Sequence, residues 1–406
     1  MDYLYKIWYK DSAYAQQQYH RNMEDTTTVM LPFNIHPLEC EQVYPLYYRP
    51  TNELMLAMEA IYQMDQRIRA VADSLPTMAK RDFINTLVVE ELFTSNEIEQ
   101  VKSTRQEIAH SVRSLQQNQQ TTKHRFHSMA YSYLSLFEDA VACPKTVEDI
   151  RKIYDQITDG EVAAENLPDG RCFRKGPEVV ETSTGRVIHR GIMPETQIHT
   201  WIEALLHFME LDQVPSLIKI AVAHYVFGYV HPFYDGNGRT GRFLSSLYLS
   251  KICSKYTAYS IAQGCRLQQK QYYEIFERTN RFNSFGEMNA FIDGFLGLIL
   301  AGQEKLYENL QDRVAAFTYA TKHLQMDEGI AGDAVKYELM CMLEQKRLFD
   351  EYGLGLARDD LEQALKERLG KLSHAAMVRC LKALEAEGYI QCTCKRPLTY
   401  QSVIGH

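Results

Sequence analysis

The sequence predicts a mainly α-helical chain with a small β-hairpin and a second, smaller C-terminal domain. Three observations lead to this fold class. Apolar residues recur at helical spacing through most of residues 51–158 and 195–325. Residues 159–192 instead carry five glycines and two short β-prone runs. Residues 331–406 follow the pattern of three helices and a terminal hairpin.

The composition is that of a globular protein without a membrane segment. The chain has 406 residues, of which 45% are hydrophobic and 24% charged, so a packed core is expected. Its net charge of −8 argues against a chain-wide nucleic-acid surface. No apolar run reaches the ~18 residues of a membrane span, and the N-terminus lacks the pattern of a secretory signal. The nine cysteines are scattered and odd in number, which favours reduced thiols and a cytoplasmic location.

The N-terminal third divides into an extension and a helical region. Residues 1–50 form the extension, where short extended pieces are expected at 30–33 and 43–48. Residues 51–158 form the helical region. Its apolar periodicity and capping residues predict helices at 51–74, from Pro76 to about residue 94, at 103–115, at 131–142, and after Thr146.

The chemistry is concentrated in one stretch, between helices expected at 216–230 and 241–252. A glycine-rich turn that enters a helix start exposes backbone N–H groups and therefore suits phosphate. Arg239 and Arg242 lie three residues apart and can both reach phosphate oxygens. Asp235 beside phosphates suits Mg²⁺, and His231 can accept a proton near neutral pH. The stretch reads His-Pro-Phe-Tyr-Asp-Gly-Asn-Gly-Arg-Thr-Gly-Arg over residues 231–242.

This stretch resembles the core motif of the Fic family, H-x-F-x-[D/E]-G-N-G-R-x-x-R, at every specified position. The resemblance implies a Fic-type helical bundle with a β-hairpin flap, in a core domain at 159–325. It also implies a protein adenylyltransferase that moves AMP from ATP to a Ser, Thr or Tyr hydroxyl of a target protein. His231 would then be the catalytic base and Asp235 the Mg²⁺ ligand. The ATP phosphates would be bound by Gly236, Asn237, Gly238, Arg239, Thr240, Gly241 and Arg242.

Position 238 bears on the reaction type. Relatives similar to Doc, which phosphorylate their targets, carry a lysine at this position. Gly238 therefore favours AMP transfer over kinase activity.

A second motif lies upstream. Ser95-x-x-x-Glu99 is similar to the family's inhibitory motif, [S/T]-x-x-x-E-[G/N], whose glutamate pairs with the second motif arginine, here Arg242. Such a carboxylate would take the guanidinium face that a γ-phosphate needs. Gln100 departs from the motif, since Gly or Asn is usual there. Thr94 and Glu97 match a capping box for the following helix.

Two further segments resemble parts of the family's site. Strands are expected at 172–174 and 186–189 with a connection at 182–185. In the family, a flap at this place holds the target segment by main-chain pairing, which assigns that role to Val187, Ile188 and His189. After the core motif, Tyr272, Tyr273 and Asn280 match the residues that border the adenine, although Phe276 replaces a smaller residue. His224, one heptad before His231, is expected to be a packed or hydrogen-bonded histidine.

The C-terminal domain at 331–406 resembles a winged-helix domain. Helices are expected at 335–343, 359–369 and 373–387, followed by strands at 389–393 and 398–403. This pattern would suggest DNA as a partner, read by the third helix. The domain carries eleven Lys and Arg residues against eleven Asp and Glu residues, which is unfavourable for phosphate binding. Protein contact or dimerisation is therefore at least an equal expectation.

Two functions from different classes follow. The first is an adenylyltransferase that uses ATP and Mg²⁺, inhibited by Glu99, which could also position a water for removing AMP. Its partners would be a hydroxyl-bearing target protein and, by self-modification or homodimerisation, a copy of itself. The alternative is a nucleotide-sensing regulator that binds DNA. A pure sensor would not need the base His231, which favours the enzyme.

Overall fold

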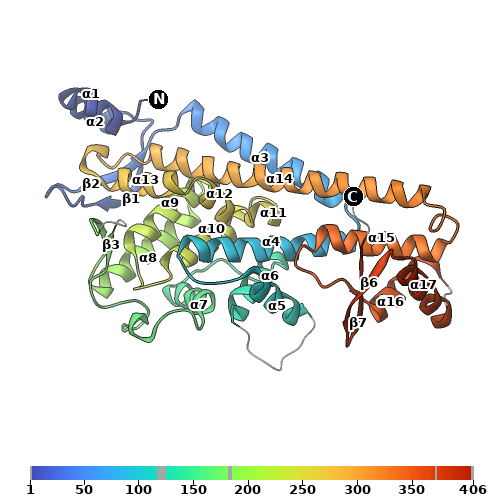
Figure 1. Ribbon diagram of the computed structural model, residues 1–406. Helices are drawn as coiled ribbons and strands as arrows, with labels where there is room; N and C mark the ends of the chain where they lie inside the picture. Colours follow the sequence, from blue (N-terminus) through green and yellow to red (C-terminus); the bar gives the residue numbers. More distant parts are fainter. Residues whose placement is uncertain (1, 117–124, 182–184, 371–372, 404–406) are drawn as a thin grey trace. The chain divides into compact units, whose positions relative to one another are not determined.

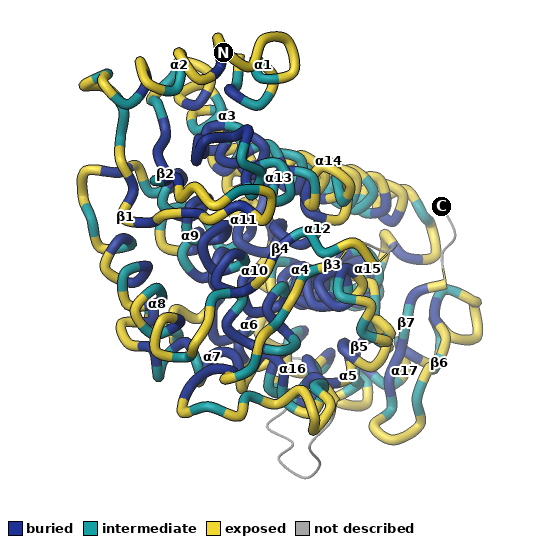
Figure 2. Tube along the Cα trace, turned by 90° about the vertical axis from the view of Figure 1, so that its left-hand side faces the viewer, coloured by how far each residue is buried: buried dark blue, intermediate teal, exposed yellow. Residues whose placement is uncertain are grey.

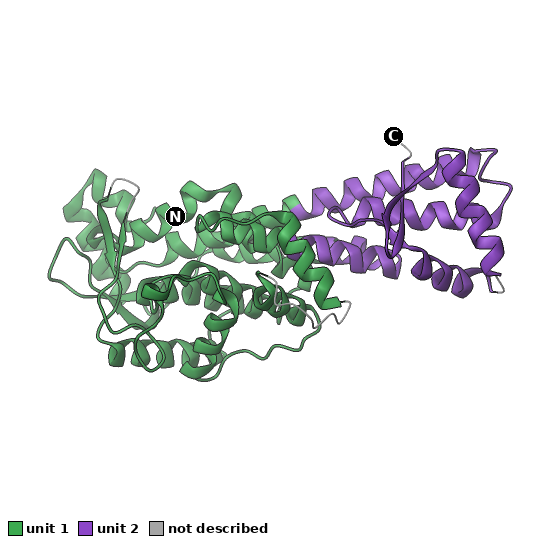
Figure 3. Cartoon of the chain, turned by 60° about the horizontal axis from the view of Figure 1, so that its bottom comes forward, with its two compact units in different colours: residues 1–67, 90–305 green, residues 68–89, 306–406 purple. Residues whose placement is uncertain are grey.

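The computed structural model describes residues 2–116, 125–181, 185–370 and 373–403, and these residues are mainly helical (Figure 1). They form two compact units, coloured separately in Figure 3. Unit 1 contains residues 1–67 and 90–305, and unit 2 contains residues 68–89 and 306–406. The unit boundaries fall inside three helices, α3, α4 and α14.

Unit 1 is built around two consecutive helices, α9 (Ser216–Val230) and α10 (Asn237–Leu249). α9 is apolar all round and buried on nearly every side, as expected of a central core helix (Figure 2). Thr146 caps α7 as expected and forms a capping box with Asp149. α7 packs on α10, and α8 packs on α9. The other helices of this part are α5 (Arg105–Gln116), α6 (His127–Phe137), α7 (Val147–Thr158), η1 (Ala164–Asn166) and α8 (Glu195–Glu210).

The remaining elements of unit 1 include α14, which packs against α9. Phe291 and Phe295 of α14 lie against Tyr225 and His224 of α9 through ring contacts. β3 and β4 form an antiparallel pair. The elements concerned are β3 (Val179–Glu181), β4 (Val187–Arg190), α11 (Lys255–Ala258), α12 (Ile261–Leu267), α13 (Gln269–Asn280), η2 (Phe282–Ser284) and α14 (Asn289–Met326).

The N-terminal extension contains two helices that the sequence reading did not identify, α1 (Leu4–Lys10) and α2 (Ser12–Glu24). Leu4 is buried, and its N–H donates to Glu287. Trp8 contacts the ring of Phe285. The two expected extended pieces are β1 (Val29–Ile35) and β2 (Tyr44–Tyr48), an antiparallel pair with Val29 opposite Tyr48.

Two long helices follow the extension, α3 (Asn52–Asp73) and α4 (Thr77–Ile98). The N-terminal half of α4 belongs to the core of unit 2, where Asp82 accepts a 2.7 Å hydrogen bond from Lys346. Thr86 likewise donates to the carbonyl oxygen of Phe349, the last residue of α15.

Unit 2 has the order of elements that the sequence predicts: three helices and a hairpin. Ser373 accepts from the N–H of Ala376 and caps the third helix as expected. β7 is the central strand of a three-stranded sheet, between β5 and β6. The elements are α15 (Ala334–Phe349), β5 (Leu356–Ala357), α16 (Arg358–Leu369), α17 (His374–Ala386), β6 (Ile390–Lys395) and β7 (Leu398–Ser402).

No helix in the described ranges is both long enough and apolar enough to cross a membrane.

Candidate active site

The stretch 231–242 forms the loop between α9 and α10 and the first turns of α10. His231 ends α9 with a left-handed backbone, φ 52°, and Gly236 precedes α10 with φ 82°. Asn237 fixes the loop between them, because its side chain accepts from the N–H of Phe233 and donates to that residue's carbonyl oxygen. Phe233 is fully buried and stacks on Tyr154 with ring centroids 3.7 Å apart. α10 thus begins four residues before the expected helix start.

The first turn of α10 carries a buried cation that has no hydrogen-bond partner in the described part of the chain. Arg239 is fully buried, and none of its three guanidinium nitrogens has a hydrogen-bond partner among the described residues. The nearest ion pair joins it to Asp235 over 3.7 Å. Burial lowers the pKa of Arg239, and Asp235 offsets only part of that effect. An anion at the N-terminus of α10 would satisfy both the guanidinium and the free N–H groups of the first turn.

Arg242, one turn further, is fully engaged by the end of α4. Its Nη1 donates to Glu99 Oε1 at 2.9 Å. Its Nε donates to Ser95 Oγ at 3.0 Å, and its Nη2 donates to the carbonyl oxygen of Ser95 at 2.9 Å. Burial alone would lower the pKa of Arg242, but the charges of Glu99, Tyr272 and Cys265, together with the hydrogen bond to Glu99, more than offset burial and the pKa is raised.

The carboxylate of Glu99 also occupies the space above Gly238. A Cβ placed on Gly238 would lie 2.1 Å from Glu99 Oε1. The two residues of the upstream motif are therefore brought onto the α10 N-terminus, as the resemblance implies.

The end of α4 explains why Glu99 points at Arg242. The N–H of Val101 donates to the carbonyl of Asn96 and that of Gln100 to the carbonyl of Glu97, which is the bonding pattern of a Schellman motif. In this motif the residue after the C-cap is left-handed, and Gln100 has φ 57°. The family's usual Gly or Asn suits this conformation better than glutamine does.

The expected capping box at Thr94 and Glu97 is wrong. Both residues lie inside α4, which continues to Ile98. Thr94 is buried, and Glu97 instead forms two hydrogen bonds with Arg266, at 3.0 and 3.1 Å. Tertiary contacts therefore override a local capping pattern here.

His231 stands at the other end of the loop, where its Nδ1 lies 3.4 Å from the carbonyl oxygen of Gly228. Burial, followed by the nearby His189, lowers the pKa of His231 to about 3. The ring is therefore neutral at physiological pH, which is the state that a general base requires.

Comparison with known proteins identifies the domain that contains these residues. The Fic/DOC family model matches residues 144–249, which include the whole loop and α10. This segment is a Fic/DOC domain.

One solved structure supports this assignment at the level of the fold, and two others give lower TM-scores. A Fic family protein from Desulfovibrio desulfuricans superposes with a TM-score of 0.50 at 20% identity, over 88% of this chain and 98% of that protein. A Fic-domain-containing signaling protein from Bacteroides thetaiotaomicron gives 0.44 at 16% identity, over 62% of this chain and 94% of that one. Fic-1 from C. elegans gives 0.39 at 15% identity, over 64% and 75% of the two chains.

Next to the Fic loop, the hairpin lies where it was expected, but one of its strands differs. β4 contains Val187, Ile188 and His189 and pairs with β3, not with residues 172–174. The expected strand at 172–174 is therefore wrong, because Glu195 binds the N–H groups of Cys172 and Phe173 in place of a strand partner. Part of the connection expected at 182–185, residues 182–184, lies outside the described residues.

His189 is the buried residue of the hairpin. Its Nε2 forms a 2.5 Å hydrogen bond with the carbonyl oxygen of Tyr229 in α9. Burial lowers the pKa of His189 to about 4. His189 thus fastens β4 to the Fic core, whereas Val187 and Ile188 are half-buried.

The three residues expected to border the adenine all lie on α13. Tyr272 is buried and its hydroxyl lies 3.0 Å from His224 Nε2. Tyr273 is 47% exposed and donates to the carbonyl oxygen of Ile98, next to Glu99. Asn280 accepts a 2.7 Å hydrogen bond from Tyr225. Of these three residues, Tyr273 is the exposed one.

Phe276, the departure from the family pattern, points at α9. A Cβ on Gly228 would lie 2.7 Å from the Phe276 ring, so the glycine makes room for the larger side chain.

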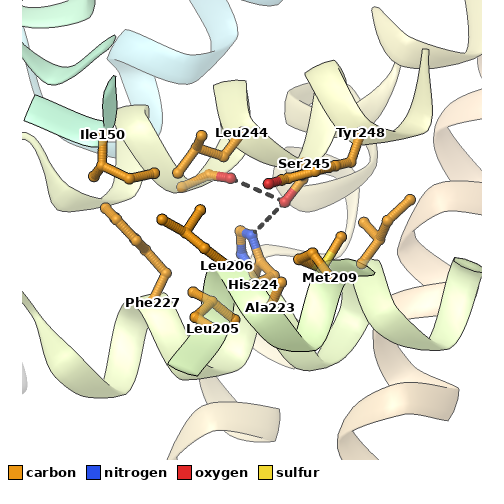
Figure 4. A pocket seen from close by; sticks show the side chains of 12 residues that line it. Ile150, Leu205, Leu206, Met209, Ala223, His224, Phe227, Leu244, Ser245 and Tyr248 are labelled. Atoms are coloured by element: carbon orange, nitrogen blue, oxygen red, sulfur yellow. Dashed lines mark hydrogen bonds between the residues drawn. The ribbon is translucent and has the colours of Figure 1, made fainter. Parts of the chain in front are cut away.

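His224 is the hydrogen-bonded core histidine that the sequence predicts. Its Nδ1 lies 2.9 Å from Ser245 Oγ, and the cavity beside it holds about 20 Å³ (Figure 4). The cavity is lined mainly by apolar side chains of α8, α9 and α10, and it has room for one water. It is too small to be a nucleotide site.

For the metal, the described ranges contain no cluster of three or more His, Cys, Asp or Glu side chains that could hold an ion. Asp235, the expected Mg²⁺ ligand, lies in the loop before α10, and its side chain is 38% exposed.

Proposed function

We propose that this chain is a protein adenylyltransferase that transfers AMP from ATP to a Ser, Thr or Tyr hydroxyl. The observation that carries the proposal is the pair of buried guanidiniums at the α10 N-terminus, on one loop with a neutral histidine. Arg239 lacks a hydrogen-bond partner among the residues that the structure describes, and Arg242 is held by a carboxylate that a phosphate could replace. This arrangement suits a polyphosphate next to a base.

In this reaction each group has one task. The target hydroxyl oxygen forms a bond to the α-phosphorus as the bond from that phosphorus to the bridging oxygen breaks, and pyrophosphate leaves. His231 takes the hydroxyl proton on its ring. Arg239, Arg242 and the N–H groups of α10 bind the phosphate oxygens. Gly238 leaves the space that those oxygens need.

Magnesium fits the same loop. Asp235 offers an exposed carboxylate beside the expected phosphates, and Mg²⁺ prefers one or two carboxylates together with phosphate oxygens. When bound, the ion would neutralise charge on the leaving pyrophosphate.

Glu99 is proposed to inhibit transfer by occupying Arg242 and the space above Gly238. The 2.9 Å Arg242–Glu99 bond supports this role. The same carboxylate could orient a water that removes AMP from a modified target.

Labelled ATP tests the proposal. The Glu99→Gly protein is incubated with Mg²⁺, target lysate and ATP labelled at either the α- or the γ-phosphate. We expect label on protein from the α-position only, less of it with the wild-type chain, and none with Glu99→Gly/His231→Ala or with EDTA. Label from the γ-position would indicate a kinase. Absence of α-label with Glu99→Gly would reject the proposed function.

A further inference from the structure

Arg174 is a fully buried arginine that neither motif contains. The hydrogen bonds that its guanidinium donates to described residues all end on main-chain carbonyl oxygens, not on carboxylates. The closest acceptors are His231 at 2.8 Å, Gly176 at 2.5 Å and Ile192 at 3.0 Å. A longer bond of 3.5 Å reaches Val230.

These acceptors belong to three different segments. Gly176 precedes β3, Ile192 follows β4, and His231 starts the Fic loop. The main chain adds to the connection, since the N–H of Arg174 donates to Pro232 and that of Ile192 donates to Val230. The guanidinium thus joins both ends of the hairpin to His231 and Val230, and the Arg174 main chain adds the bond to Pro232.

The backbone at His231 needs such support. A left-handed conformation costs a non-glycine residue about 1–2 kcal/mol, so surrounding contacts must hold it. Arg174 binds the carbonyl of this residue directly. Gly191 allows the contact, because a Cβ there would lie 2.2 Å from Arg174 Nη2 and 3.1 Å from His231 Cβ.

Packing alone would not select a charged residue here. Burying a cation whose hydrogen bonds to described residues end on carbonyl oxygens is costly, and the charge of Glu178 offsets only part of the effect of burial on its pKa. An apolar side chain would fill the same space at lower cost. The guanidinium supplies what an apolar side chain cannot, which is several donors fixed in one plane.

We infer that Arg174 is a positioning residue that orients His231 and fixes the β3–β4 hairpin relative to it. The inference rests on the proposed function, in which His231 acts as the base and the hairpin holds the target. Arg174 touches neither ATP nor the target in this account.

The test compares substitutions of two arginines in the Glu99→Gly protein. Arg174→Lys keeps the charge but cannot reach three segments at once. Arg151→Lys is the matched control, because Arg151 also donates to a main-chain carbonyl of this region, that of Cys172 at 3.1 Å. ATP affinity is measured by calorimetry, and AMP transfer is measured at saturating ATP and increasing target.

We expect Arg174→Lys to lower the rate at saturating ATP by about 100-fold, the effect of a misplacement of roughly 1 Å. ATP affinity should be unchanged, since the phosphate-binding residues remain. Arg151→Lys should change neither quantity. A rate equal to that of the parent protein, or a parallel loss of ATP affinity, would overturn the inference.

A second substitution covers the case in which Arg174→Lys fails to fold. Gly191→Ala keeps the guanidinium but pushes it away from His231, at a position without a left-handed backbone. We again expect a lower rate at saturating ATP together with an unchanged ATP affinity. A parental rate in a folded Gly191→Ala protein would contradict the inference.

A spectroscopic readout separates this inference from the proposed function. If Glu99→Gly transfers no AMP, the proposed function fails, and the ring signals of ¹⁵N-labelled histidines still report on Arg174. The His231 signals, assigned by their loss in His231→Gln, should shift in Arg174→Lys and stay in place in Arg151→Lys. Unmoved signals in Arg174→Lys would reject the positioning role.

Discussion

At the scale of residues, Arg242 is the group for which Glu99 and a phosphate compete in the proposed function. Its guanidinium is fully buried, and its bonds to Ser95 and Glu99 take the donors that a phosphate would use. The two partners contribute differently, because Ser95 lies inside α4 and Glu99 at its end. Ser95 orients the guanidinium, whereas Glu99 supplies the opposing charge.

Ser95→Ala should therefore weaken inhibition without abolishing it. The loss leaves Arg242 Nε without its acceptor, at a cost of about 1–3 kcal/mol to the inhibited arrangement. We expect AMP transfer between that of the wild type and that of Glu99→Gly, measured with α-labelled ATP. Ser246→Ala is the control, since Ser246 is also buried but its Oγ has no partner among the described residues. Transfer unchanged in Ser95→Ala would contradict this role.

His224 predicts a pH dependence of stability. Burial, and then the charge of Arg242, lower the pKa of His224 to about 3, whereas an unfolded histidine titrates near 6.5. Between these values the unfolded chain binds more protons, so stability falls as pH falls below about 6.5. From pH 7.5 to 5.5, this site should remove about 1 kcal/mol of the free energy of unfolding.

The comparison is with His224→Gln, which retains hydrogen-bonding groups but does not titrate. Denaturant unfolding at the two pH values should show a smaller loss for His224→Gln than for the wild type. Equal losses would show that His224 does not contribute to the pH dependence.

At the scale of elements, the end of α4 decides where Glu99 lies. The helix ends in a Schellman motif whose left-handed position is Gln100. Because this conformation is unfavourable for glutamine, the motif is less stable here than it would be with glycine.

Gln100→Gly should strengthen both the helix end and inhibition. Removing the Cβ at φ 57° is expected to stabilise the protein by about 1 kcal/mol. Basal AMP transfer should fall, because Glu99 is held more firmly against Arg242. Gln100→Val introduces a branched side chain at the same position. It should lower the stability measured by denaturation and raise basal AMP transfer. Higher transfer in Gln100→Gly than in the wild type would contradict this account.

At the scale of the whole molecule, the surface charge bears on the choice between enzyme and DNA-binding regulator. The net charge is −8, and residues 331–406 carry equal numbers of basic and acidic residues. Because affinity for DNA depends largely on phosphate neutralisation, such a surface is expected to bind DNA poorly.

A gel-shift experiment tests this expectation. Genomic fragments at physiological salt should not be retarded by the full chain, with or without ATP. Retardation that persists at that salt concentration would favour the regulator. Lys382→Glu, on the exposed side of α17, would then show whether that helix contacts the DNA.

The sequence predicted most of the long helices of both units and the glycine turn that leads into α10, because these depend on local periodicity and on a short motif. It missed contacts between distant segments. The α1 segment lacks a clear helical periodicity of apolar residues. Its place in the structure is set by contacts with Phe285 and Glu287, which are distant in the sequence. Arg174 was expected in a strand, whereas the partners of its guanidinium lie up to 57 residues away in the sequence. Main-chain carbonyl acceptors in distant segments leave no pattern around Arg174 in the sequence.

The measurement that tests the central claim most directly is mass spectrometry of lysate proteins after treatment with ATP, Mg²⁺ and the Glu99→Gly protein. The account predicts peptides that carry one added AMP on a Ser, Thr or Tyr hydroxyl. It also predicts that these peptides disappear when the Glu99→Gly/His231→Ala protein is used. An added phosphate in place of AMP, or the same modified peptides without His231, would contradict the claim.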